Sequence, residues 1–193
     1  MEKKFFETIK IIDGKPQNLA YHQARVDRTI KENFFHESFD LKRHINFNRD
    51  GLYKCKLIYS DMFEELTFDP YTPKIIKTIK LVDANIDYSY KYFDRENINK
   101  LKPEGIDEII IIKNGLITDT TIANISLKID DIWYTPQTPI LQGTQREKLL
   151  YEGKIQPKKL SIDALHEASQ IGFMNAMIGW VIYDKTKLSI SSV

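Results

Sequence analysis

The sequence predicts a mixed α+β protein built from two domains. Apolar residues in Leu19–Phe35 recur at helical spacing, whereas those in Tyr53–Tyr59 fall at every second position, which is typical of a strand. The chain has 193 residues, enough for one large domain or two small ones. We therefore expect a small α+β domain over residues 1–85 and a larger, mixed and β-rich domain over residues 86–193.

The composition excludes several classes of protein. Hydrophobic residues make up 42% of the chain and charged residues 28%, as in an ordinary globular protein. The net charge of +1 gives no field that would attract nucleic acid or an acidic membrane. No apolar run approaches the ~20 residues that cross a bilayer, and the charged start of the chain is not typical of a signal peptide. The single cysteine, Cys55, fits a reducing cytoplasm, and the scattered histidines lack metal-ligand spacing, so we expect a cytoplasmic protein without metal, nucleic-acid or membrane partners.

The N-terminal half predicts a strand, a helix and further strands. Phe5–Ile12 has strand composition, and the Asp13-Gly14 pair after it is a hairpin signal. Leu19–Phe35 places apolar residues on one face of a helix and contains neither Gly nor Pro. We expect the next three strands to form an antiparallel meander: Tyr53–Tyr59, Met62–Phe68 and Ile75–Val82.

Arg25 lies at the edge of the apolar face of this helix, three residues after His22. An arginine in such a place commonly extends its charged end to solvent while its stem covers apolar surface. The alternative is an inward-pointing arginine that binds an anion, because a planar guanidinium suits phosphate or carboxylate. The residues alone leave both interpretations open.

The C-terminal half predicts a helix, a buried strand and a β-rich remainder. Asp94 is expected to cap a helix that continues to Leu101. The apolar run Ile109–Ile112 and the Asn114-Gly115 turn predict a hairpin that returns as one long strand, Leu116–Ile129. Further helices are expected after Gly143 and over Ser161–Ala168, and further strands at Gln170–Met174, Trp180–Tyr183 and Leu188–Ile190.

The sequence has no glycine-rich nucleotide loop, nucleophile elbow or Cys–His motif, but three other features suggest chemistry. Lys91 stands among the aromatic residues between Tyr88 and Phe93, and a partly dehydrated lysine can act as an amine nucleophile. The ordinary alternative is a lysine that covers an aromatic face. Asp119 is a carboxylate beside a buried strand, where burial is costly without a partner. Gly143 opens a helix whose first N–H groups could bind an anion.

Taken together, the motifs resemble those of the class IV pyridoxal-phosphate enzymes, which include branched-chain and D-amino-acid aminotransferases and aminodeoxychorismate lyase. The resemblance implies the two-domain fold type IV, the D-amino-acid aminotransferase-like fold, with a shortened N-terminal domain. Six segments carry it in order: Phe5–Ile9 with Asp13-Gly14, His22 with Arg25, Lys91, Leu116–Ile125, Thr135-Pro136 with Gly143–Arg146, and Asn175–Met177.

The resemblance implies pyridoxal 5'-phosphate as the cofactor and gives a role to each matching residue. Lys91 would hold the cofactor as a Schiff base and then act as general base and acid. Asp119 would pair with the pyridine nitrogen and keep it protonated. The phosphate would be bound by the side chain of Arg25 and by backbone N–H groups of Thr144, Gln145, Asn175 and Ala176.

Other residues depart from the family pattern or keep open roles. The family usually has glutamate where Asp119 stands, and aspartate is one methylene shorter, so the pairing needs a closer backbone. Asn124 is expected to fix the loop around Asp119. Arg95 and Arg146 could bind a substrate carboxylate or form structural ion pairs, and the second role is favoured.

The residues around Lys91 and Asn175 favour one reaction. Lys91–Arg95 and Asn175–Met177 are more similar to the lyase pattern than to that of branched-chain aminotransferases. The resemblance therefore implies a 4-amino-4-deoxychorismate lyase-like enzyme of the folate branch, which gives 4-aminobenzoate and pyruvate from a small amino substrate, and a homodimer. The alternatives are a class IV aminotransferase for branched-chain or D-amino acids, and a non-catalytic binding protein that keeps the fold.

Overall fold

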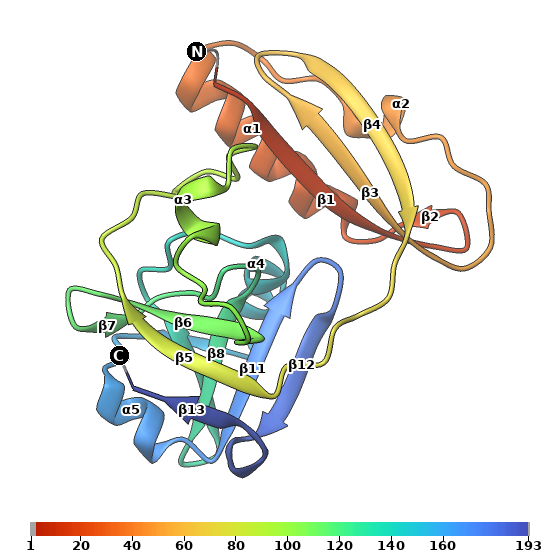
Figure 1. Cartoon of the computed structure of the whole chain (residues 1–193). Coiled ribbons are helices and arrows are strands. Elements are labelled where there is room, and N and C mark those ends of the chain that lie inside the picture. Colours follow the sequence, from red (N-terminus) through yellow and green to blue (C-terminus); the bar gives the residue numbers. More distant parts are fainter. Residues whose placement is uncertain (1–2, 193) are drawn as a thin grey trace. The chain divides into compact units, whose positions relative to one another are not determined.

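The computed structural model describes residues 3–192, which form two compact units (Figure 1). The first unit extends to Pro73 and includes Tyr90–Asp94, and the second contains Lys74–Ser89 and the chain from Arg95 onward. The division falls before residue 85, where the sequence placed a boundary. The reason is that β5 (Thr78–Asp83) pairs in parallel with β6 (Glu108–Lys113) and so belongs to the second unit.

The first unit is an antiparallel sheet with the strand order β2-β1-β3-β4, together with the helix α1. Strand β1 pairs with β3 over its whole length, and the predicted Asp13-Gly14 hairpin is confirmed, with φ of 47° and 75° at its two residues. The bounds are β1 Phe5–Ile12, β2 Lys15–Pro16, α1 Leu19–Phe34, α2 Leu41–His44, β3 Leu52–Tyr59 and β4 Phe63–Pro70.

The core of the first unit includes alternate residues of β1. Phe5, Ile9 and Ile11 are fully buried among apolar side chains of α1 and β3. Because side chains of a strand alternate between its faces, Glu7 belongs to the same row, and its carboxylate is also fully buried. The remaining buried members of this core are Val26, Ile30, Leu41, Cys55, Leu57 and Tyr59.

The second unit contains two sheets, ordered β10-β9-β8-β11-β12 and β13-β5-β6-β7. Side chains of both sheets form one apolar core, which includes Ile110 of β6 and Phe173 of β11. No helix within residues 3–192 is long and apolar enough to cross a membrane. The bounds of the remaining elements are α3 Glu96–Asn99, β7 Leu116–Ile117, β8 Asn124–Ile129, β9 Ile132–Pro136, α4 Thr144–Tyr151, β10 Gln156–Lys158, α5 Ile162–Glu167, β11 Gln170–Asn175, β12 Gly179–Asp184, η1 Lys185–Lys187 and β13 Ser189–Ser191.

The mixed α/β class is confirmed, but three local predictions are wrong. The expected third strand of the meander is β5, which joins the other unit. Helix α3 is a single turn that begins after Arg95, so Asp94 does not cap it. The long strand predicted over Leu116–Ile129 breaks between β7 and β8, because the hydroxyl of Thr120 accepts the N–H of Ala123 at 2.9 Å and holds a turn there.

Candidate active site

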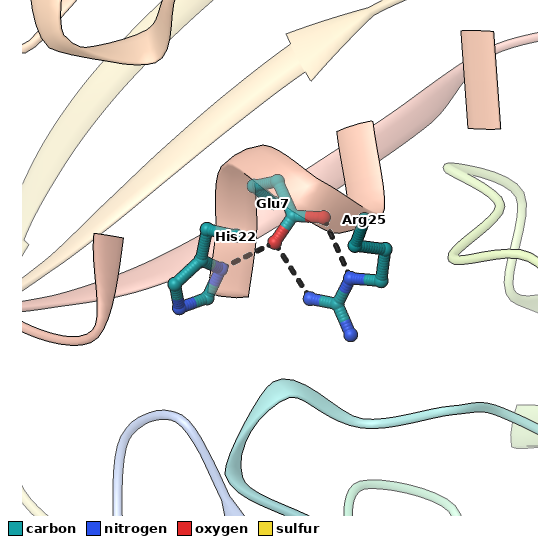
Figure 2. Close-up of polar contacts among 3 residues, drawn as sticks. All are labelled: Glu7, His22 and Arg25. Carbon is teal, nitrogen blue, oxygen red and sulfur yellow. Dashed lines mark hydrogen bonds and ion pairs between the residues drawn. The ribbon is translucent and has the colours of Figure 1, made fainter. Parts of the chain in front are cut away.

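In the first unit, three polar side chains form a buried cluster, which we call the Glu7 cluster: Glu7, His22 and Arg25 (Figure 2). Arg25 donates from Nε to Glu7 Oε1 at 2.8 Å and from Nη2 to Oε2 at 2.6 Å. His22 Nδ1 lies 2.6 Å from the same Oε2. Arg25 is only 5% exposed, so it points inward and is not a solvent-directed arginine, and its partner in the structure is the Glu7 carboxylate.

The charges of the Glu7 cluster largely compensate one another. Burial by itself raises the pKa of Glu7, but the guanidinium of Arg25 and the hydrogen bond with His22 outweigh burial and lower the pKa to about 2. Burial lowers the pKa of His22, although its hydrogen bond with Glu7 opposes the change. The cluster therefore combines an ionised carboxylate, a guanidinium and a neutral imidazole at neutral pH.

Lys91 belongs to the same unit and lies in an extended segment beside β1. Its backbone oxygen accepts the N–H of Phe6 at 3.0 Å, and its Nζ lies 4.3 Å from the centroid of the Phe6 ring. The rings of Tyr90 and Tyr92 instead pack against Phe5. One aromatic partner of Lys91 is thus a residue of β1, and the lysine itself is half-buried.

In the second unit, Asp119 lies in the turn between β7 and β8. Its side chain is 4% exposed and accepts hydrogen bonds from the N–H of Leu141 at 2.8 Å and from Asn124 Nδ2 at 2.6 Å. Burial raises the pKa of Asp119 to about 6, although these two donors oppose the shift. Among residues 3–192 no cationic side chain forms an ion pair with it.

This environment fits the cofactor that the resemblance implies. A buried carboxylate without a cation is costly, and a protonated pyridine nitrogen would supply both a positive charge and a hydrogen-bond donor. A carboxylate has about four lone-pair sites, so the donors Asn124, Leu141 and Ile140 leave room for one more. Asp119 therefore has the charge and the acceptor capacity to bind such a ring.

Asn124 connects Asp119 to the start of α4. Its Nδ2 also donates to the backbone oxygen of Leu141 at 2.7 Å, so one amide group joins the Asp119 turn to the loop before the helix. Gly143 has no space for a side chain there, because a Cβ would lie 2.0 Å from Asn124 Oδ1. The role expected for Asn124, to fix the loop around Asp119, is confirmed.

The first turn of α4 contains Thr144 and Gln145, both buried. The residue before the helix, Gly143, has no side chain that could cap the first turn. The first hydrogen bond of the helix runs from the N–H of Glu147 to the backbone oxygen of Gly143 at 3.0 Å. The backbone N–H groups before Glu147 therefore point out of the helix end, where the helix dipole favours negative charge. Chemically, this turn can bind a phosphate.

Asn175 ends β11 and shapes the turn that contains Ala176. Its Oδ1 accepts the N–H groups of Met177 and Ile178, each at 2.9 Å. Its Nδ2 donates to the backbone oxygen of Ile122 at 3.1 Å, which ties this turn to the Asp119 turn. Hydrogen bonds within the second unit thus connect Asp119, the start of α4 and the Asn175–Ala176 turn.

The two arginines with open roles make structural contacts. Arg95 donates to the hydroxyl of Tyr88 at 3.0 Å and to the backbone oxygen of Thr121 at 2.6 Å. Arg146 donates to the backbone oxygen of Pro136 at 2.9 Å, and it forms no salt bridge within the described part of the chain. Arg95 therefore supports the Asp119 turn, while the ion pair favoured for Arg146 is absent from residues 3–192.

Two buried carboxylates near these residues were missed from the sequence. Glu7 interrupts an otherwise apolar alternating row in β1, which was the available signal. Glu108 directly precedes the apolar run of β6, and it accepts bonds from the hydroxyl and the N–H of Thr121 at 2.7 and 3.0 Å. The burial of both carboxylates depends on contacts with residues distant in the sequence, which the sequence alone does not show.

Comparisons with known proteins agree with this picture. Residues 99–184 match the family model of amino-transferase class IV. An uncharacterized protein of Haemophilus influenzae is 38% identical over 183 residues, which are 90% of this chain and 97% of that protein. The crystal structure of a candidate 4-amino-4-deoxychorismate lyase from Haemophilus somnus is 35% identical, has a TM-score of 0.84, and covers 93% of this chain and 98% of its own.

A more distant structure shows the fold with its cofactor. A hypothetical aminotransferase from Mycobacterium tuberculosis, in its PLP-bound form, is 16% identical with a TM-score of 0.78 over 98% of this chain and 84% of its own. The fold type IV expected from the motifs is thereby confirmed. The chain belongs to the class IV aminotransferase family of pyridoxal-phosphate-dependent enzymes.

Proposed function

We propose that the protein is a pyridoxal-phosphate-dependent lyase that converts 4-amino-4-deoxychorismate into 4-aminobenzoate and pyruvate. The similarity to the Haemophilus somnus protein over 93% of the chain supports the lyase reaction. The lyase-like residues Lys91–Arg95 and Asn175–Met177 support it as well. The observation that carries the cofactor assignment is Asp119, a buried carboxylate that forms no salt bridge within residues 3–192 and whose pKa burial raises although the charge of Arg146 opposes the shift.

Each unit contributes its own residues to this proposal. From the first, Lys91 would bind the cofactor covalently and Arg25 would contact its phosphate. From the second, Asp119 would bind the ring nitrogen, and the N–H groups of Thr144, Gln145, Asn175 and Ala176 would bind phosphate oxygens. When bound, pyridoxal phosphate supplies an aldehyde that captures the substrate amine and a cationic ring that accepts electrons.

The chain supplies the proton transfers. Nζ of Lys91 would remove the proton from the amine-bearing carbon of the substrate, which is general-base catalysis worth about 10²–10⁴-fold in rate. Asp119 would keep the pyridine nitrogen protonated by its negative charge. Asn124 and the N–H of Leu141 hold that carboxylate in one orientation.

The second candidate is an aminotransferase of the same family, and the family match favours it. Both reactions begin with removal of the same proton. They differ in the later steps, because the lyase expels pyruvate while an aminotransferase transfers the amino group to the cofactor. A single product assay can therefore separate them.

The test supplies enzymatically made 4-amino-4-deoxychorismate to the cofactor-loaded protein and measures pyruvate. We expect pyruvate from the wild type and from Lys56→Ala, and at least 10²-fold less from Lys91→Ala. Lys56 is a matched control because its Nζ lies 5.7 Å from the same Phe6 ring. If no pyruvate forms while an amino acid converts the cofactor to its amine form, the protein is the aminotransferase.

The proposal includes a homodimer in the cytoplasm, as the resemblance implies. Light scattering coupled to size exclusion measures the mass in solution directly. A mass of twice the 22.6 kDa chain is expected, and a monomer at all concentrations would contradict this part of the proposal.

A further inference from the structure

The Glu7 cluster contains one polar atom that the mechanism above does not use. His22 is fully buried, and its Nε2 has no hydrogen-bond partner within the described chain. A buried polar atom left without a partner costs about 1–3 kcal/mol. In Figure 2 this nitrogen lies on the side of the ring away from the Glu7 carboxylate, so a ligand atom rather than Glu7 would satisfy it.

Glu7 decides the chemical character of that nitrogen. An ionised carboxylate only accepts hydrogen bonds, so the ring nitrogen 2.6 Å from it, Nδ1, carries the hydrogen. Nε2 of the neutral ring is then a lone-pair acceptor. A second proton would convert it into a donor without breaking the bond to Glu7.

The charge of the cluster explains when that proton would be needed. Glu7 and Arg25 cancel each other, so a doubly charged anion at Arg25 would bring more negative charge than the nearby ammonium of Lys91 alone can offset. Protonation of His22 would offset part of this negative charge and provide a hydrogen bond to the anion.

The other titratable groups near the cluster in the first unit would not take up a proton when an anion binds near pH 7. Burial raises the pKa of the Cys55 thiol on β3 to about 12 and also raises the pKa of Tyr59, so both stay neutral near pH 7. Arg25 stays protonated. The positive charge of Lys91 opposes a proton on His22, and an arriving anion would counter that opposition.

We propose that His22 is a further contact for the anion at Arg25, and that anion binding loads one proton from solvent onto its Nε2. The idea rests on the proposed function, in which Arg25 binds the cofactor phosphate. It adds a residue to that phosphate site and couples its affinity to pH through a neutral histidine.

The test uses sulfate, because sulfate is already fully ionised near neutral pH and any proton taken up must reside on the protein. Calorimetric titration in two buffers of different ionisation enthalpy counts the protons. We expect close to one proton per sulfate, and an affinity that falls about tenfold per pH unit between pH 6.5 and 8. His22→Gln should bind sulfate more weakly and take up no proton, whereas His36→Gln, which alters an exposed histidine of the same unit, should match the wild type.

A second measurement needs no variant and covers the case in which His22→Gln does not fold. In protein with ¹⁵N-labelled histidine, one ring should change from a neutral Nδ1–H form to an imidazolium when sulfate is added. Absence of sulfate binding, binding without proton uptake, or uptake that persists in His22→Gln would overturn the inference.

Failure of the proposed function would look different. If sulfate loads His22 but the protein forms no adduct with pyridoxal phosphate, the anion site stands and the cofactor assignment falls. If the adduct forms at Lys91 but sulfate binding takes up no proton, the cofactor assignment stands and the inference about His22 falls.

Discussion

Each unit buries a carboxylate beside residues predicted to bind the cofactor, and two of these carboxylates, Glu7 and Asp119, differ in the direction of their pKa shift. Glu7 and Asp119 are 0% and 4% exposed, yet the pKa of Glu7 is lowered to about 2 and that of Asp119 is raised to about 6. Glu7 has a bidentate arginine, whereas Asp119 has amide and backbone N–H donors and feels the charge of Arg146 without a salt bridge to it. Burial is the same in both, so the partner decides the sign of the shift.

The difference indicates a structural role for Glu7 and a binding role for Asp119. Glu7 has its cation within the protein, so its contribution to folding is complete without a ligand. Asp119 keeps a negative charge that costs stability until a cation arrives, which is the usual condition of a binding residue. A cationic pyridine ring would give Asp119 what Arg25 already gives Glu7.

The strongest way to break the comparison is to remove the charge of Glu7. Glu7→Gln removes the negative charge that pairs with the buried guanidinium of Arg25, so unfolding by urea should show a loss of about 3–5 kcal/mol. Glu64→Gln is the matched control, because it breaks a partly exposed pair with Lys4 and should cost at most about 1 kcal/mol. Equal losses in both variants would show that the Glu7 cluster contributes nothing special to stability.

The geometry that holds Asp119 can be tested at Gly143. Because an added Cβ would meet Asn124 Oδ1 at 2.0 Å, Gly143→Ala should destabilise the protein by about 1–3 kcal/mol. In an Asn124→Ala background the same change should cost at least about 1 kcal/mol less. Additive losses in thermal or urea unfolding would show that these two residues do not touch.

The smallest expected effect is the pH dependence of Asp119. A raised pKa means that the folded, unliganded protein keeps this proton while the unfolded chain loses it, so Asp119 weakens stability as pH rises from about 4 through 6. Between pH 5 and 7.5 the wild type should lose about 1–2 kcal/mol relative to Asp119→Asn. Urea unfolding at both pH values measures this difference. If the wild type instead gains stability relative to Asp119→Asn between these pH values, the pKa of Asp119 is not raised.

Glu7 should act in the opposite direction and in a different pH range. Its lowered pKa means that its contribution to stability is present above about pH 4.5 and is lost as pH falls toward 2. The two carboxylates can therefore be distinguished in one acid titration of the unfolding free energy. In the Glu7→Gln variant, the unfolding free energy should no longer fall as pH drops toward 2. It should still decrease as pH rises above 5, because that decrease comes from Asp119.

Much of the fold could be predicted because local patterns determine it. The helical spacing in α1 and the alternation in β3 gave those elements nearly to the residue. The pairing of β5 with β6 could not be predicted, because composition shows that a segment is a strand but not which strand it joins. The break before β8 was missed, because a threonine hydroxyl that bonds its own turn competes with the ladder.

The candidate site divides in the same way. Arg25, Lys91 and Asp119 could be named from motifs, but the partners that set their properties come from distant parts of the sequence. Glu7, Leu141 and Phe6 are examples, each brought into contact by tertiary packing. Residue type therefore suggested the chemistry, while the direction of each pKa shift required the structure.

The most direct test of the account is to locate the lysine that binds pyridoxal phosphate. Borohydride reduction of the cofactor-loaded protein, followed by peptide mass spectrometry, marks that lysine permanently. We expect a single adduct on Lys91, retained in Lys56→Ala and lost in Lys91→Ala together with the visible absorbance of the bound cofactor. An adduct on Lys56 or another lysine, or no adduct in the wild type, would contradict it.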